Sequence, residues 1–136
     1  MKRQNRQKSF FSIEEFINEI PEILAPKNEG EKLIKWASEL GENLKNRGMT
    51  TSQIRKIFSL LKDKDLQVYD LNMIRAKLAY VAGRHRSQVG DLQKALDEMI
   101  KYIINSSFDF EHNVKVFRDF FEAVVAYHRK FGGKEG

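Results

Sequence analysis

The side chains that could perform acid–base, nucleophilic or metal chemistry are spread thinly along this chain. The three histidines, His85, His112 and His128, lie far apart, and no two have the spacing of metal ligands on one helix. Glu122 falls on the polar side of an expected helix, and Ser52 fits the start of a helix better than a nucleophile. The chain has no cysteine, so a thiolate metal site and a cysteine nucleophile are excluded. The sequence therefore predicts no catalytic site, no metal and no cofactor.

Positive charge is concentrated in a few segments of this sequence. The formal net charge is +5, and the surplus lies in three stretches without acids, residues 1–13, 75–86 and 127–134. Outside these stretches the chain is net acidic. Such segregation favours a polyanionic partner, above all nucleic acid, although basic clusters on small domains are often only solvated faces.

The segment RAKLAYVAGRHR, residues 75–86, combines basic residues with the apolar spacing of a helix. At 100° per residue its apolar side chains fall on one arc. Arg75 and Arg86 lie on one flank of that arc, and Lys77 and Arg84 lie on the other. Long basic side chains in flanking positions can lay their stems on the domain and hold their charges in a fixed direction. The pattern predicts a rigid row of cations suited to phosphate contacts.

Two tyrosines could add stacking or subunit contacts to these cations. Tyr80 projects away from the apolar arc of its helix, between basic neighbours, and Tyr127 lies close to Arg129 and Lys130 in the sequence. Each ring could stack on a base, or pack against a neighbouring helix or subunit. Most phenylalanines fall at core positions of helices, so we expect them in the interior.

Helices must position these residues. Beyond Pro26 nothing interrupts helix formation, and no stretch alternates apolar and polar residues, so the sequence predicts an all-α fold. We expect a compact bundle of five to six helices. The expected ranges are about 13–20, ended by Pro21 and Pro26; 31–47; 51–62; 69–90, stopped at Gly90; 91–105, capped by Asp91; and 109–131.

The length of 136 residues suits a single domain. We expect residues 1–11 to form a basic flexible arm and residues 12–136 to form the helical bundle. The basic N-terminus is not followed by the apolar stretch of a secretory signal, and no apolar run reaches membrane-spanning length. The sequence thus favours a soluble, cytoplasmic protein.

Three segments together resemble a known family. They are TTSQIRKI (residues 50–57), LAYVAGR (78–84) and FFEAVVAYHRKFGG (120–133), and their order and spacing resemble the small subunit of type III-A CRISPR–Cas effector complexes, the Csm small subunit. The resemblance runs from about residue 45 to the C-terminus. It implies a helical bundle without catalytic activity that contributes to antiviral defence. Several copies would line the groove in which guide RNA pairs with target RNA.

The resemblance also indicates which residues contact RNA. The basic positions within matching motifs are Arg55, Lys56, Arg84, Arg129 and Lys130, and the charge pattern alone adds Arg75, Lys77 and Arg86. Their expected role is phosphate neutralisation, because sequence-independent contacts suit a protein that must accept any guide and any target. The implied partners are guide RNA, target RNA, the other subunits of the effector and further copies of this chain.

Two other interpretations remain open at this point. The chain could be a purely protein–protein scaffold whose basic clusters meet acidic partner surfaces. It could also be a small helical nuclease or transcription regulator, although the sequence offers neither paired carboxylates nor a clear recognition helix.

Overall fold

The computed structural model describes residues 11–25, 29–61, 65–106 and 109–135. Among these residues six α-helices and one short 3-10 turn follow one another, and none forms a strand. The all-α bundle predicted from the sequence is therefore confirmed. The elements are α1 (Ile13–Leu24), α2 (Glu31–Asn46), α3 (Thr51–Phe58), the turn η3 (Ser59–Leu61), α4 (Val68–Arg84), α5 (Arg86–Asn105) and α6 (Phe110–Lys130).

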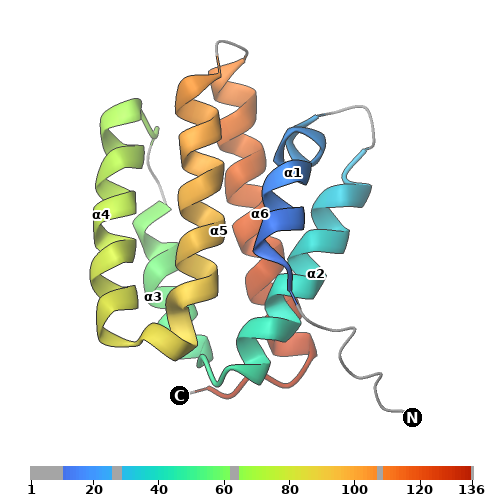
Figure 1. Cartoon of the computed structure of the whole chain (residues 1–136), viewed down its shortest axis with the longest axis vertical. Coiled ribbons are helices and arrows are strands. Elements are labelled where there is room, and N and C mark those ends of the chain that lie inside the picture. Colours follow the sequence, from blue (N-terminus) through green and yellow to red (C-terminus); the bar gives the residue numbers. More distant parts are fainter. Residues whose placement is uncertain (1–10, 26–28, 62–64, 107–108, 136) are drawn as a thin grey trace.

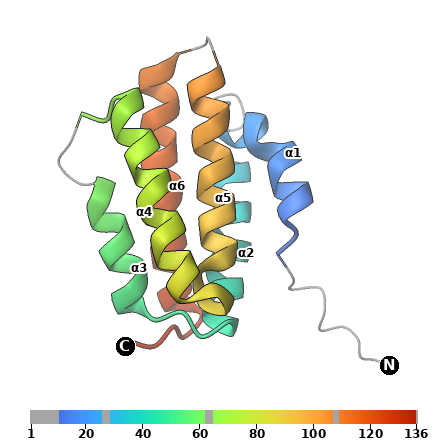
Figure 2. The same ribbon diagram turned by 60° about the vertical axis from the view of Figure 1, so that its left-hand side comes forward.

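Helices α5 and α6 form the middle of the bundle (Figure 1). Helices α1 and α2 lie on one side of this central pair, and α3 and α4 lie on the other, as the turned view also shows (Figure 2). The most extensive packing joins α2 to α6 and α4 to α5. Because α3 rests mainly on α6 while α4 rests on α5, the two outer helices on that side are held by different neighbours.

Aromatic side chains fill much of the core. The ring of Phe16 from α1 lies 5.6 Å from that of Trp36 in α2 and 5.7 Å from that of Phe120 in α6. Phe58 at the end of α3 meets Phe121 of α6 edge-on, with ring centroids 5.3 Å apart. Each such side chain removes a large apolar area from water, so these contacts tie α1, α2 and α3 to the central helix.

The predicted flexible arm lies almost entirely outside the described residues, since residues 1–10 are not among them. Phe11, its last residue, packs in the bundle: its ring lies 5.5 Å from that of Phe16 and 5.9 Å from that of Trp36.

Three helix starts follow from their capping residues. The Ser12 hydroxyl accepts a hydrogen bond from the backbone N–H of Glu15 at 3.2 Å, which caps α1. Thr50 and Gln53 form the predicted capping box of α3, each side chain accepting from the other's backbone N–H. Asp109 caps α6. These local signals could be read from the sequence because each needs only residues three apart.

The prediction that Pro21 ends the first helix is wrong. Helix α1 continues through Pro21 to Leu24. A proline inside a helix removes one backbone hydrogen bond and costs about 3 kcal/mol. Beyond it, however, Ile23 and Leu24 are almost fully buried, and burying each such side chain contributes about 1.5–3 kcal/mol. Tertiary packing of the last turn therefore outweighs the local penalty.

The predicted boundary at Gly90 and Asp91 is also wrong. Helix α4 ends at Arg84, His85 alone leaves the helical conformation, and α5 begins at Arg86, so Gly90 and Asp91 lie inside α5. His85 serves both helices, since its N–H donates to the carbonyl of Val81 and its carbonyl accepts from the N–H of Val89. The reversal lets α4 pack along α5, which a single long helix could not do.

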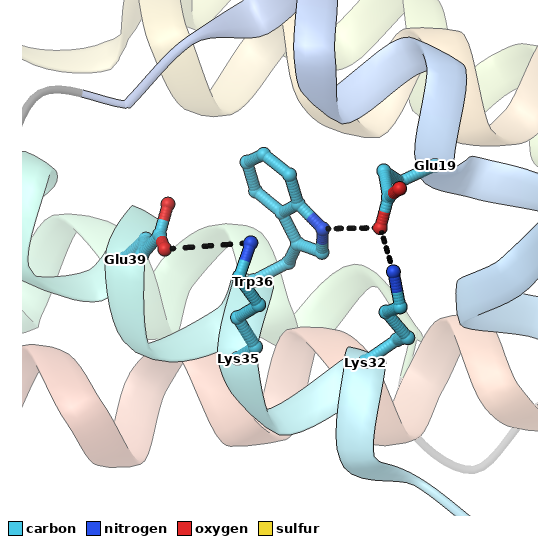
Figure 3. A network of polar contacts seen from close by, with 5 residues as sticks. All are labelled: Glu19, Lys32, Lys35, Trp36 and Glu39. Carbon is cyan, nitrogen blue, oxygen red and sulfur yellow. Dashed lines mark hydrogen bonds and ion pairs between the residues drawn. The ribbon is translucent and has the colours of Figure 1, made fainter. Parts of the chain in front are cut away.

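A polar contact joins α1 to α2 beside the aromatic core (Figure 3). Lys32 donates to the carboxylate of Glu19 at 2.6 Å, and the indole N–H of Trp36 donates to the same oxygen at 3.3 Å. The bond from Lys32, together with that from Trp36, holds the pKa of Glu19 below its ordinary value of 4.5. The same bond raises the pKa of Lys32 above 10.5.

This contact gives a pH-dependent prediction for Glu19→Gln. A carboxyl whose pKa is lowered on folding stabilises the folded state above its unfolded pKa, and this stabilisation is lost as pH falls through the folded value. We therefore expect the variant to be less stable than the parent protein at pH 7, and the difference to shrink below pH 4.5. Urea unfolding of both proteins at pH 7 and pH 3 measures the difference in their free energies of unfolding.

Glu39→Gln is the matched control. It removes the more exposed ion pair between Lys35 and Glu39, whose charged atoms lie 3.7 Å apart, one turn from each other on α2 (Figure 3). Exposed pairs contribute little, so its effect should be small at both pH values. A deficit for Glu19→Gln that is equally large at both pH values would contradict the assignment.

Candidate nucleic-acid interface

A groove of about 530 Å³ lies between α3 and α4, on the side of the bundle away from α1. It exists because the two helices are held by different neighbours and make few contacts with each other among the described residues. Ten residues line it: Gln53, Lys56, Ile57 and Leu60 from the α3 side, and Ala76, Lys77, Tyr80, Val81, Arg84 and His85 from the α4 side.

The charges around this groove have one sign. Lys56, Lys77 and Arg84 are exposed, and no aspartate or glutamate is among the lining residues. In the described part of the chain none of these three cations takes part in an ion pair. The guanidinium of Arg84 lies 5.9 Å from the ring centroid of Tyr80, whose side chain is 67% exposed. The groove lining therefore presents three cations beside an open aromatic face, and the acids Glu135 and Asp70 line the adjacent hollows.

The helical spacing explains why these residues meet. Lys77, Tyr80 and Arg84 follow one another at three and four residues, so they share one face of α4. Lys56 lies off the apolar face of α3, because Ile54 and Ile57 are the buried positions there. Sequence reasoning placed each residue on its own helix face. Only the packing of α3 and α4 on separate central helices brings the two faces together.

The start of α3 is held by the C-terminal tail. The backbone N–H groups of Thr51 and Ser52 donate to the carbonyls of Lys134 and Glu135, at 2.6 and 3.0 Å. These two donors have no partner within the helix, so the tail completes the first turn of α3. The sequence predicted a helix over about 109–131 and no contact for the tail that follows it. Its contact with a segment about eighty residues earlier has no local signal.

Arg55 and Arg129 lie near this tail. Arg55 is exposed and lines a shallow hollow with Lys56 and Glu135. Arg129 donates to Glu135 at 2.8 Å and to the carbonyl of Gly133 at 3.0 Å. Arg55 therefore continues the positive surface of the groove, whereas Arg129 is engaged in holding the tail.

Arg75 and Arg86 do not line the groove. Arg75 pairs with Asp97 of α5 at 2.7 Å and also donates to Asn72. Arg86 lines a separate hollow on the α4–α5 side together with Arg47 and Lys94. The prediction that Arg75 and Arg86 share one flank of a single helix is therefore wrong, because α4 ends at Arg84 and Arg86 begins α5. The acid that pairs with Arg75 comes from α5.

Tyr127 and Lys130 lie at the end of α6, apart from the groove lining. Tyr127 is partly buried, and its ring centroid lies 6.4 Å from that of Phe131. The ammonium of Lys130 lies 5.5 Å from the centroid of Phe131. Tyr127 therefore packs within the bundle, and Tyr80 is the more open of the two tyrosines.

Several lining residues were not among the predicted site residues. The apolar ones are Ile57, Leu60, Ala76 and Val81, and the polar ones are Gln53 and His85. Part of this signal is present in the sequence, because α4 carries Ala76 and Tyr80 outside the buried stripe formed by Leu71, Ile74, Leu78 and Ala82. Such a helix indicates a second surface to cover.

The described residues contain no cluster of three or more histidine, aspartate or glutamate side chains that could hold a metal ion. Within the same ranges no helix is both long and apolar enough to cross a membrane.

One comparison with known proteins identifies the family of this chain. Searches of curated proteins and of solved structures found no match. The family model described as Csm2 Type III-A matches residues 27–134, which include both helices of the groove and Lys134 of the tail that holds α3. The chain belongs to the Csm2 family, the small subunits of type III-A CRISPR effector complexes.

Proposed function

We propose that this subunit is non-catalytic and contacts the phosphates of the guide RNA–target RNA duplex through the α3–α4 groove, independently of sequence. The observation that supports this most is the acid-free rim of Lys56, Lys77 and Arg84, none of which is paired within the described residues. Arg and Lys side chains contribute affinity for phosphates through counterion release, whatever the base sequence.

The other predicted residues differ in how readily they could contact a phosphate. Arg55 extends the positive surface next to Lys56, and Arg86, at the start of α5, offers a second contact in the hollow that it lines with Arg47 and Lys94. Arg75 and Arg129 are paired with Asp97 and Glu135, so they would have to exchange partners to reach a phosphate. Lys130 is exposed at the end of α6, outside the groove, whereas the ring of Tyr127 packs near Phe131 within the bundle.

In this proposal the subunit acts within the assembled effector complex in the cytoplasm. Several copies of the chain associate along the filament with the other effector subunits, and each presents its groove to the RNA duplex. Sequence recognition is left to base pairing between guide and target. A subunit with this task needs a fixed positive surface rather than an active site, and the rigid α4 supplies one at a low ordering cost on binding.

The test is a triple variant, Lys56→Gln, Lys77→Gln and Arg84→Gln. We expect its affinity for a single-stranded RNA of arbitrary sequence to fall roughly tenfold to a hundredfold at moderate salt. The slope of log affinity against log salt should fall by about 2–3, because each lost phosphate contact removes about 0.7–0.9. Fluorescence anisotropy at several salt concentrations measures both quantities.

The matched control removes three other exposed charges, with Lys35→Gln, Lys101→Gln and Lys115→Gln. Each of these lysines pairs with an acid on its own helix, so the net charge changes equally while the groove stays intact. We expect nearly unchanged binding. Equal losses for both triples would reject a localised site. Unchanged RNA binding with failed assembly of the effector would favour the protein–protein scaffold instead.

A further inference from the structure

The groove has a feature that phosphate contacts do not use. Its rim is cationic, but its interior is formed mainly by apolar side chains, those of Ile57, Leu60, Ala76, Val81 and the ring of Tyr80. Phosphate groups need cations that reach into solvent, and they gain nothing from an apolar hollow. A purely electrostatic surface could be flat, so the hollow indicates an occupant with an apolar body.

The charges limit what that occupant can be. An apolar side chain from a neighbouring protein would fill the hollow and leave Lys56, Lys77 and Arg84 without counter-charges. Because these three exposed side chains make the rim positive, the occupant that complements it brings negative charge at the rim together with its apolar body. The volume of about 530 Å³ lies within the range of small-molecule pockets, about 300–1,000 Å³.

We propose that the groove receives one unstacked nucleobase of the bound RNA, with the base in the hollow and its flanking phosphates on the cationic rim. This inference rests on the proposed function and adds a base subsite to it. Splayed-out bases in RNA complexes stack on aromatic rings and on arginine planes. Tyr80, 67% exposed, offers such a ring, and the guanidinium of Arg84 lies 5.9 Å from its centroid.

The same groove has little capacity to distinguish one base from another. Gln53, its one carboxamide, already accepts from the N–H of Thr50 and donates to Gln88 at 3.2 Å. One of its two N–H donors and one acceptor site of its oxygen are therefore engaged within the protein. Stacking tolerates every base, since each has an aromatic face. The subsite should accept any nucleotide, as a subunit that serves all guides requires.

Two alanines on α4 provide a matched pair of variants. Ala76 and Ala79 are both exposed, but Ala76 lines the groove whereas Ala79 lines the separate hollow beside Arg86. Ala76→Phe fills the proposed base subsite, and Ala79→Phe adds the same ring to the same helix outside it. Both changes lie on the surface, so both proteins should fold, and thermal unfolding monitored by circular dichroism checks this.

The measurement compares two probes of equal length and charge. One is a single-stranded RNA of mixed sequence, and the other is a ribose–phosphate oligomer that lacks the bases. We expect the parent protein and Ala79→Phe to bind the base-bearing RNA about fivefold or more tightly than the abasic oligomer. Ala76→Phe should bind both probes with the same affinity, close to that of the abasic oligomer for the parent protein.

A second series uses Tyr80. Tyr80→Phe keeps a ring and should retain the preference for base-bearing RNA, whereas Tyr80→Ala should lose most of it. Equal, salt-sensitive binding of both probes by the parent protein would overturn the base subsite and leave the phosphate-contacting function intact. No binding of either probe would reject both. A preference that Ala76→Phe retains would assign the hollow to another occupant, such as an acidic segment of a partner protein.

Discussion

Replacing Gly41 with alanine is expected to lower the free energy of unfolding by about 1–3 kcal/mol, although alanine is the better helix former. Gly41 lies in the middle of α2 where that helix crosses α6. A Cβ atom there would lie 2.8 Å from the backbone nitrogen of His128 and 2.9 Å from Cβ of Tyr127. Backbone atoms cannot rotate away, so the two helices would have to move apart. Urea unfolding measures the loss.

The control for Gly41→Ala is Gly90→Ala. Gly90 also lies inside a helix, but an added Cβ would meet no atom within 4 Å. At this position only the higher helix propensity of alanine relative to glycine should act, so the substitution should stabilise the protein by up to about 1 kcal/mol. The two substitutions should therefore change stability in opposite directions. A stabilising Gly41→Ala would mean that α2 and α6 are less closely packed than the structure has them.

Most of the fold could be predicted from sequence because its signals are local. Amphipathic spacing indicates the helices, and Ser12, Thr50 and Asp109 each mark a start through a bond to a residue three positions on. The errors fall where tertiary packing overrides a local rule. Pro21 is retained inside α1 by the burial of the turn that follows it. The reversal at His85 serves the packing of α4 along α5 rather than any turn residue.

The candidate site divides in the same way. The helical spacing alone separates Lys77 and Arg84 from Arg86. In the structure Lys77 and Arg84 line the groove, whereas Arg86 lines a different hollow. Helical spacing cannot reveal that Asp97, on the next helix, pairs with Arg75. Nor can it show that Lys56 faces Lys77 across a hollow, because that depends on α3 and α4 resting on different central helices.

Gly133→Ala is expected to destabilise the protein by about 2 kcal/mol, because it should release the C-terminal tail from α3. A side chain at position 133 would overlap the imidazole of His128. That ring is fully buried, and its Nε2 lies 2.6 Å from the carbonyl of Met49, so it cannot swing aside. The tail would move instead, and the N–H groups of Thr51 and Ser52 would lose their acceptors. Hydrogen exchange at those two amides reports the release directly.

A double-mutant cycle separates this contact from a general effect of the tail. His128→Ala removes the ring, so adding Gly133→Ala to it should cost far less than Gly133→Ala costs alone, and the coupling should exceed about 0.5 kcal/mol. Additive losses would contradict the contact. Because the tail holds the start of α3, and α3 contributes Lys56 and Ile57 to the groove, the single variant should also bind RNA more weakly. Gly133 thus acts on the groove through packing, without contributing a charge to it.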